Sequence, residues 1–486
     1  MLDAAGAGEP RVEEVEVAPT DPQRLAELIG AERLAAFGEL AERLRRRLAD
    51  RCVWQVNSTA RGGGVAEMLR SHLAYVRGAG VDARWLVIPG SLAFFSLTKR
   101  IHHALHGSPG DGGPLGDRER RLYEETLHTA LPGIVARLGA RDVIVLHDPQ
   151  TAGLIPELAR LGHPVIWRCH VGSERTSSEI DRAWDFLAPY VSRARACVFT
   201  RASYIPACCD GKRGAVISPA IDPLSPKNQE LAPDVVRAIL AHVGILAGPA
   251  PATPPVFRRS DGSPRRVDRC ADIRRGGPAP AWEDPVITQV SRWDPLKDPV
   301  GVLRGFERLL EMGAPPEAHL VLAGPSVRAV ADDPEAVATY EGVEAVWRSL
   351  PFAVRRRSSL VSLPLVDVEE NAAIVNALQR HATVVVQKSL EEGFGLTVSE
   401  AMWKARPVVA SAVGGITDQI VDGEHGVLLA DPTDRDAFAG ALRDLLLGDP
   451  ARRERLGANA RARVAEHFLV SSAITAYGRL LETLDV

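Results

Sequence analysis

The 486-residue sequence lacks the features that mark several classes of protein. Its six cysteines form no Cys-x-x-Cys pair and have no regular spacing, so they indicate neither a zinc site nor a disulfide framework. Charge of one sign is not in large excess, since the formal net charge is −4, and we expect no binding to nucleic acid or to an anionic membrane. No apolar run approaches the length of a membrane span, and the acidic start is unlike a signal peptide. These absences favour a globular protein of the cytoplasm.

Short, β-branched apolar runs alternate with helix-like segments along most of the chain. They lie at 52–56, 143–146, 165–167 and 197–200, and again at 286–290, 319–322, 360–363, 383–386 and 407–410. Continuous apolar strands separated by helices predict parallel sheets covered on both faces. A chain of this length accommodates two domains. We therefore expect two doubly wound, Rossmann-like α/β domains, with a deep cleft at the carboxyl ends of their strands.

The composition changes between residues 247 and 284, where proline, glycine and arginine are frequent. A stretch of this length is either a linker or a functional excursion over the surface. We expect an N-terminal domain at 1–225, the linker or excursion at 226–284, and a C-terminal domain at 285–468. The last residues, 469–486, are expected to form a helix that packs back on the first domain.

Residues 389–415 place two glutamates around a glycine-containing turn, between an apolar strand and a helix. Glu392 and Glu400 can accept hydrogen bonds from hydroxyl groups, while Gly393 and Gly395 permit close approach of the backbone. A helix N-terminus adds favourable potential for phosphate. The pattern predicts binding of a nucleotide sugar. Because residues 397–400 also match a capping box, the alternative for Glu400 is that it caps its own helix.

Two cations follow the first strand of the second half. Arg292 comes directly after that strand, and Lys297 lies in the turn before the next helix. A planar arginine fork and a lysine point charge at the carboxyl edge of a sheet can hold a diphosphate. The alternative is that each cation pairs with a nearby carboxylate, Asp294 or Asp298.

A glycine loop follows the first strand of the first half. Residues 57–67 include three consecutive glycines before a helix, so their N–H groups can reach an anion. The loop is not a G-x-G-x-x-G fingerprint and lacks the Lys-Ser/Thr of a P-loop. A tight turn without a ligand is the alternative.

Two histidines, His147 and His170, each lie at or beyond the end of a predicted strand and therefore at the same edge of the first sheet. We expect them to hydrogen-bond sugar hydroxyls. The alternative is a structural role with both rings satisfied internally.

Taken together, the motifs resemble those of the retaining GT-B glycosyltransferases of family 4, and within them the trehalose-forming synthases. The resemblance covers about residues 50 to 450. It is carried by residues 53–59, 62–67, 94–99, 147–150, 167–170, 221–228, 290–294, 376–380 and 387–395.

The resemblance implies a nucleoside diphosphate-glucose donor and a small sugar acceptor, most simply glucose, and it is compatible with a homodimer. No cofactor and no essential metal are expected. Implied catalytic residues are Arg292, Lys297, Glu392 and His170. Implied donor-binding residues are Gly62, Gly63, Gly64, Gly393, Phe394, Gly395, Leu396, Thr397 and Glu400. Implied acceptor-side residues are Asn57, Glu67, His147, Asp148 and Gln150.

Within the implied site, Glu392 holds the donor sugar, Glu400 the ribose, and Arg292 with Lys297 the diphosphate. Members of the family usually carry an acidic–aliphatic run directly after the histidine that corresponds to His170. Residues 171–176 depart from that pattern, so the identity of the acceptor stays open.

The implied reaction is glycosyl transfer with retention of configuration. No carboxylate is clearly placed as a covalent nucleophile, so same-face attack is favoured, with the departing phosphate taking the proton of the acceptor. Stabilising charge on the leaving group in such a site contributes about 3 to 4 kcal/mol.

Three alternatives remain. A related phosphorylase would exchange the disaccharide with inorganic phosphate. A nicotinamide-dependent oxidoreductase would use Asp82 for ribose, but the glycine fingerprint is missing. A sensor would bind the nucleotide sugar without turnover.

Overall fold

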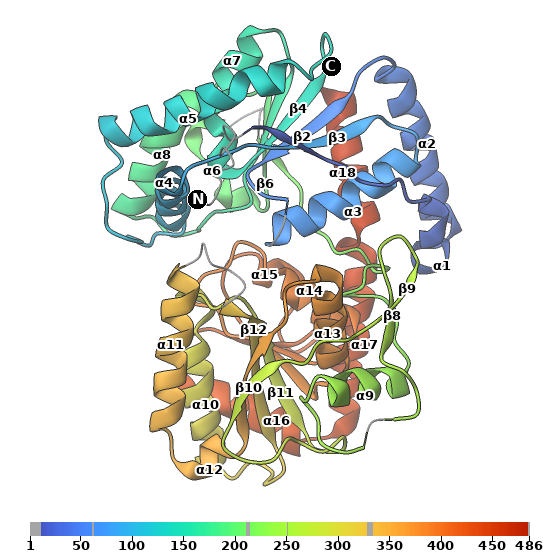
Figure 1. Ribbon diagram of the computed structural model, residues 1–486, viewed down its shortest axis with the longest axis vertical. Helices are drawn as coiled ribbons and strands as arrows, with labels where there is room; N and C mark the ends of the chain where they lie inside the picture. The colour runs from blue at the N-terminus through green and yellow to red at the C-terminus, as the bar shows by residue number, and fades with distance from the viewer. Residues whose placement is uncertain (1–10, 61–62, 210–213, 250, 328–333, 485–486) are drawn as a thin grey trace, which may run out of the picture. The chain divides into compact units, whose positions relative to one another are not determined.

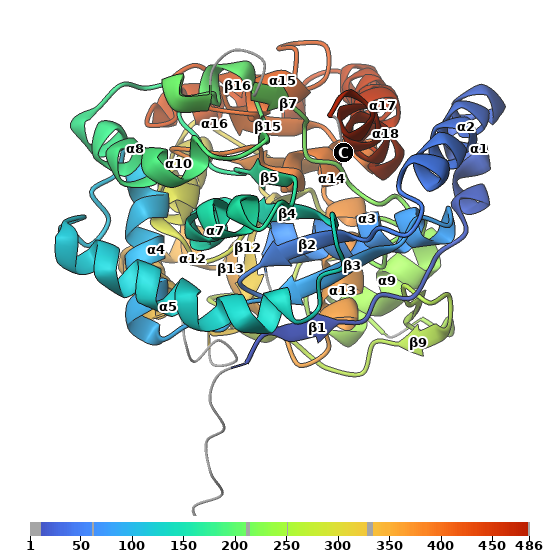
Figure 2. The ribbon, with the colours of Figure 1, turned by 90° about the horizontal axis from the view of Figure 1, so that it is seen from above.

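The computed structural model describes residues 11–60, 63–209, 214–249, 251–327 and 334–484. The chain forms two compact units: the first holds the residues up to Ala220 and those from Val470 onward, and the second spans Ile221–Leu469. Each unit has a mostly parallel sheet with helices on both faces (Figures 1 and 2). The prediction of two doubly wound, Rossmann-like α/β domains is therefore confirmed.

The first unit is built on a seven-stranded sheet with the order β1-β3-β2-β4-β5-β6-β7, in which only the edge strand β1 is antiparallel. Its strands are β1 (Glu13–Val15), β2 (Val53–Asn57), β3 (Ala83–Val87), β4 (Val143–His147), β5 (Val165–Arg168), β6 (Ala196–Phe199) and β7 (Gly214–Val216). Its helices are α1 (Ala26–Ile29), α2 (Ala31–Arg47), α3 (Gly64–Gly78), α4 (Leu92–Leu105), α5 (Asp117–Val135), α6 (Asp148–Thr151), α7 (Ile155–Arg160), α8 (Ser178–Val191) and α18 (Val470–Thr483).

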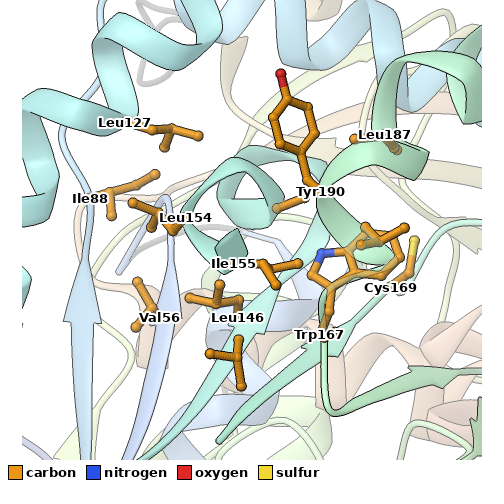
Figure 3. Packing of buried hydrophobic residues seen from close by; sticks show 14 of the residues in the cluster. Val56, Ile88, Leu127, Leu146, Leu154, Ile155, Trp167, Cys169, Leu187 and Tyr190 are labelled. Atoms are coloured by element: carbon orange, nitrogen blue, oxygen red, sulfur yellow. The ribbon is translucent and has the colours of Figure 1, made fainter. Parts of the chain in front are cut away.

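Alternate residues of these strands enter two different cores, because successive side chains of a strand point to opposite faces. Val56, Leu146 and Trp167 belong to the core under α4, α5 and α8, which Figure 3 shows from close by. Val145 and Ile166 belong to the core under α2, α3 and α18. The continuous apolar runs of the sequence follow from this burial on both faces.

The second unit repeats the arrangement with the order β10-β13-β12-β11-β14-β15-β16, in which only β10 is antiparallel. Its strands are β8 (Val256–Arg258), β9 (Pro264–Arg266), β10 (Asp272–Arg275), β11 (Val286–Val290), β12 (His319–Pro325), β13 (Ser358–Leu363), β14 (Val384–Gln387), β15 (Val408–Ser411) and β16 (Val427–Leu429). Its helical segments are α9 (Pro233–His242), the 3₁₀ turn η6 (Pro295–Lys297), α10 (Pro299–Glu311), α11 (Pro334–Ser349), α12 (Phe352–Arg355), α13 (Val368–His381), α14 (Leu396–Trp403), α15 (Ile416–Gln419), α16 (Arg435–Leu447) and α17 (Pro450–His467).

Two cores flank this sheet as well. Phe306 of α10 and Phe438 of α16 lie in the core on one face. Ile239 of α9 and Ile374 of α13 lie in the core on the other. Helix α10 begins where Asp298 caps it, through a hydrogen bond from the Gly301 N–H to Oδ1 of 2.9 Å.

The segment 226–284, expected as a linker or an excursion, is folded, and the boundary between the compact units falls at 220/221. This segment forms α9, the hairpin β8–β9 and the edge strand β10, and all of it belongs to the second unit. Two of its arginines have carboxylate partners about a hundred positions further along the chain: Arg259 contacts Asp367 at 2.5 Å, and Arg269 pairs with buried Glu370. A segment whose composition is typical of a linker is here held in place by ion pairs to the start of α13.

The last helix, α18, packs against α2 and α3 within the first unit. Its buried residues include Ala473 and Leu481, which join the core on that side of the first sheet. In the part of the chain that the structure describes, no helix combines the length and the apolar character needed to cross a bilayer.

Candidate active site

In both sheets the order in which the chain adds strands reverses near the centre, which creates a switch point. The predicted residues follow the strands that flank these two switch points. In the first unit the chain runs from β2 to β3 on one side and later to β4 on the other; β11, β12 and β14 repeat this pattern in the second. Open α/β sheets bind ligands outside the carboxyl ends of strands at such switch points. His147 ends β4, and Arg292 and Glu392 follow β11 and β14. The topology therefore places the candidates where this class of sheet binds ligands.

In the second unit Glu392 is held by three donors. Lys297 Nζ lies 2.5 Å from its Oε2, and the Ser389 hydroxyl donates to the same oxygen over 3.2 Å. The amide of Gln387 donates to it over 3.4 Å. The side chains of Lys297 and Glu392 are 16% and 12% exposed, so water only partly screens their attraction. The structure thus brings together two of the predicted catalytic residues as an ion pair.

A second ion pair lies beside it, between the buried ammonium of Lys388 and Asp298. Asp298 has a positive φ of 47° and also caps α10. The alternative that Lys297 pairs with Asp298 is therefore wrong, because Lys388 occupies Asp298. Lys297 instead turns to Glu392, while its own carbonyl accepts a hydrogen bond of 2.9 Å from the buried Gln289 amide.

For Arg292, the alternative of a nearby carboxylate partner describes the structure. Arg292 Nη2 lies 3.2 Å from Asp294 Oδ2, as the pairing with a nearby carboxylate predicted. The Arg292 side chain is 57% exposed, and exposed ion pairs contribute little free energy. The guanidinium is therefore able to exchange Asp294 for an anionic ligand at small cost.

The turn after Glu392 depends on glycine. Gly395 has a φ of 84°, and a Cβ at this position would lie 3.2 Å from the Glu392 Cγ. Helix α14 begins directly after it, and the first N–H groups of a helix have no acceptor within the helix. Leu396 and Thr397 therefore present backbone donors next to Gly393, Phe394 and the Glu392 carboxylate, as an anion site requires.

Glu400 does not cap its helix, so the capping-box alternative is wrong. Gly395 is the N-cap, in the left-handed conformation, and no side chain caps the helix there. Glu400 lies one turn further on, 3% exposed, and its Oε1 is 3.1 Å from Lys227 Nζ. The helix begins at Leu396 because glycine alone tolerates the backbone turn that precedes it.

In the first unit the two predicted histidines form one hydrogen-bonded chain, which we call the histidine chain: Arg168, His170, His147 and Gln55. Gln55 Oε1 can only accept, so the His147 Nε2–H donates to it over 2.7 Å. His147 Nδ1 then accepts from the His170 Nε2–H over 3.2 Å, and His170 Nδ1 accepts from the Arg168 Nε–H over 3.4 Å. Both imidazoles therefore have a defined neutral tautomer.

Burial and the positive charge of Arg168 keep both imidazoles of this chain neutral. Burial, assisted by the positive charge of Arg168, lowers the pKa of His147 to about 3 and holds the pKa of His170 well below its ordinary value. The rings stack with centroids 5.5 Å apart and an angle of 10° between their planes. With both nitrogens engaged, His170 can offer a ligand the edge and face of a neutral ring. It is not poised as a proton donor.

Asp148 orients the same chain. Its φ is 62°, and its Oδ1 accepts a hydrogen bond of 2.7 Å from the backbone N–H of His170. Burial raises the pKa of Asp148 to about 6. Gln150 lies nearby in α6, half-buried. Asp148 therefore acts on the position of His170 in addition to any contact with an acceptor.

The remaining candidates of the first unit lie at the end of β2 and the start of α3. Asn57 is buried, with its Oδ1 accepting from the Trp85 indole and its Nδ2 donating to the Thr59 carbonyl, both over 2.8 Å. Its amide thus fixes the turn that follows the strand. Gly63 precedes α3 with a φ of 80°, Gly64 begins the helix, and Glu67 is exposed in its first turn. Gly62 lies outside the described residues.

Residues 171–176, which depart from the family pattern, run from a buried start to an exposed end. A Cβ on Gly172 would lie 2.3 Å from the Tyr204 ring, so the backbone packs closely there. Glu174 pairs with Arg201 at 2.9 Å and accepts from the Ser203 hydroxyl at the same distance. The acidic residue of this segment is therefore committed to its neighbours.

Sequence reasoning assigned no role to several residues that the fold brings to these sites. Polar side chains within or directly after apolar strands were the available signal. They are Gln55, Arg168, Gln387, Lys388 and Ser389. Lys227 gave no such signal, because its partner Glu400 lies on a distant helix.

Comparison with known proteins identifies the family of the chain. A family model described as "Trehalose synthase, N-terminal domain" matches residues 55–206, and one described as "Glycosyl transferases group 1" matches residues 368–463. The trehalose synthase of Pyrococcus horikoshii is 34% identical over 460 residues, which are 94% of this chain and 95% of that protein. The trehalose phosphorylase of Pleurotus pulmonarius is 27% identical over 92% of this chain and 58% of its own length.

A solved structure shows the same fold. The α,α-trehalose-phosphate synthase (UDP-forming) from Burkholderia xenovorans, in complex with glucose-6-phosphate, superposes with a TM-score of 0.66. The identity is 17%, and the superposition covers 89% of this chain and 100% of that one. The expected GT-B fold is thereby confirmed. Since a relative above 30% identity is matched almost end to end, the chain belongs to the trehalose synthase family and is a glycosyl-transferring enzyme.

Proposed function

We propose that the protein transfers glucose, with retention of configuration, from a nucleoside diphosphate-glucose to glucose and so forms trehalose. The observation that carries this proposal is the Lys297–Glu392 pair beside the glycine turn of α14. It combines a cation for a phosphate, an acceptor for sugar hydroxyls and free helix N–H groups in one place.

The pair has two tasks in this proposal. When the donor binds, Lys297 turns from Glu392 to the diphosphate, and Arg292 leaves its exposed partner Asp294 to join it. Glu392 is then free to accept hydrogen bonds from the sugar hydroxyls. Charge that develops on the leaving diphosphate is met by two cations already in position.

The acceptor proton goes to the leaving phosphate in this mechanism. The neutral histidine chain supports this choice, because His170 has both ring nitrogens engaged and a pKa well below its ordinary value. His170 then shapes the sugar site, and the attack occurs on the face from which the phosphate departs.

The reaction is proposed to need no metal, because arginine, lysine and backbone dipoles meet the charge of the diphosphate. The test is turnover in the presence of excess EDTA. Unchanged kcat is expected, and loss of activity that Mg²⁺ restores would overturn this part.

The decisive experiment is a matrix of UDP-, ADP- and GDP-glucose against free sugars, with products identified by NMR. We expect one donor to yield α,α-trehalose with glucose. If no donor is consumed with any sugar, the transferase proposal fails.

A second candidate is a phosphorylase, because a trehalose phosphorylase is among the relatives. Breakdown of trehalose that depends on inorganic phosphate and proceeds without a nucleotide would favour it. Breakdown that depends on a nucleoside diphosphate would favour the synthase running in reverse.

A further inference from the structure

The chain forms a tight turn immediately after it enters the second unit. The Asn228 N–H donates to the Ser225 carbonyl over 2.9 Å, and the Asn228 side chain donates to the Asp222 carbonyl over 3.0 Å. Asn228 is 2% exposed. Residues 222–228 therefore have a fixed backbone path.

Side chains of α13 and α14 hold the end of this turn. The carbonyl groups of Pro226, Asn228 and Gln229 all accept hydrogen bonds from these helices. The donors are Asn376 at 3.1 and 2.9 Å, Arg380 at 3.2 and 2.9 Å, and Trp403 at 3.2 Å. Lys404 Nζ also donates to the Asn228 side chain over 3.0 Å. The backbone before Lys227 is thus fixed to α13, and the backbone after it to both α13 and α14, the helix that carries Glu400.

Lys227 itself reaches Glu400. The two atoms Lys227 Nζ and Glu400 Oε1 are 3.1 Å apart, and the side chains are 21% and 4% exposed. Among the described residues, no other cation has an ion pair with this carboxylate. The ion pair therefore fixes one oxygen of the Glu400 carboxylate in place.

We propose that Lys227 is a positioning residue for ribose recognition: it holds Oε1 of Glu400, so that Oε2 is oriented to accept from the ribose hydroxyls of the donor. This inference rests on the proposed function, in which Glu400 binds the ribose. Lys227 acts through Glu400 and does not itself contact the reacting atoms.

The test is calorimetric binding of UDP and ADP, and of their 2′,3′-dideoxy forms, to the wild type and to Lys227→Met. We expect the variant to lose about tenfold to a hundredfold in affinity for the ribonucleotide, the effect of a lost charge-assisted hydrogen bond. Affinity for the dideoxy form should not change. Glu400→Gln should show the same loss, and adding Lys227→Met to it should have no further effect.

Several controls separate the outcomes. Arg266→Met removes an exposed cation of the segment 226–284, which pairs with Asp268 at 3.9 Å. It should leave the affinities for the ribonucleotide and for its dideoxy form unchanged. Lys227→Arg should restore the ribose preference, and thermal unfolding reports whether each variant is folded. If Lys227→Met is not folded, Lys227→Gln, which keeps a polar side chain, serves in its place.

Equal weakening of the ribo and dideoxy forms, or additive losses in the double variant, would overturn the inference. The proposed function fails differently: the wild type would then bind no nucleoside diphosphate, or Glu400→Gln would leave the ribose preference intact.

Discussion

The two units place polar residues at equivalent points of equivalent sheets, yet the electrostatics of these points are opposite. At the first switch point two neutral imidazoles share hydrogen bonds, with their pKa values lowered by burial. At the second, Lys297 and Lys388 each pair with a carboxylate. The same topology therefore supports a closed network of hydrogen bonds around two neutral imidazoles in one unit and two lysine–carboxylate ion pairs in the other.

The difference suggests a division of labour. A neutral sugar can be met by the edge and face of a neutral imidazole, which the hydrogen-bonded chain holds in place without a charge on the ring. A diphosphate needs cations, and cations that are stored in ion pairs remain charged and oriented until the ligand replaces the carboxylate. Each of the following changes alters one side of this comparison.

The largest effect is expected for Lys297→Met. Loss of the cation that meets the diphosphate should lower kcat by about 10² to 10³. It should also lower the free energy of unfolding, because Glu392 loses its partner in a partly buried place. Steady-state kinetics and urea unfolding measure the two effects. Arg348→Met, which removes an exposed cation paired with Glu344, is the control and should change neither.

Glu392→Gln separates charge from shape. The amide keeps one acceptor for the sugar but loses the ion pair, so kcat should fall by about tenfold to a hundredfold while the fold stays intact. Combining it with Lys297→Met should recover stability, since no charge is left unpaired, but should recover no activity. Near-normal turnover of Glu392→Gln would remove this residue from the site.

Acid should destabilise the first unit through its buried histidines. Burial lowers the pKa of His72 and of His147 to about 4 and about 3, while the unfolded chain protonates near 6.5. The unfolded state therefore binds more protons below that pH, and stability is lost as the pH falls from about 6.5 toward these values, by up to about 1.4 kcal/mol per pH unit for each histidine.

Asp148 acts in the opposite direction, because its raised pKa of about 6 makes the folded state bind a proton first. Asp148 alone opposes His72, His147 and His170, so the free energy of unfolding should still decrease as the pH falls. Urea unfolding of the wild type at pH 7.5 and 5.5 measures the loss, and His72→Leu should reduce it. Equal stability at both pH values would contradict the neutral histidine chain.

The smallest effect is expected for Gln55→Leu. The His147 Nε2–H loses its acceptor, which should lower the free energy of unfolding by about 1 to 3 kcal/mol. Turnover should fall only modestly, because the chain positions neutral groups and carries no proton. A loss of kcat as large as that of Lys297→Met would show that the first unit takes part in charge stabilisation.

Local patterns were sufficient to predict most of the parallel strands. The runs at 143–146 and 286–290 are buried on both faces, and such burial leaves a continuous apolar run in the sequence. The short or polar edge strands β1 and β10 were not predicted, because they carry little apolar signal. For a related reason the composition of 226–284 left a linker and an excursion open: the partners of Arg259 and Arg269 lie at the start of α13, and composition does not reveal them.

The sequence by itself determined the two α/β domains, the glycine turn after Glu392 and the residue types that a nucleotide sugar needs, since each depends on neighbours within a few positions. Tertiary structure alone decided the pairings: Lys297 with Glu392 across 95 positions, Lys388 with Asp298 across 90, and Lys227 with Glu400. It also decided that Gly395, not the capping box at 397–400, begins α14. The physical reason is that charge pairing depends on distance in space, which strand order sets and which local spacing does not encode.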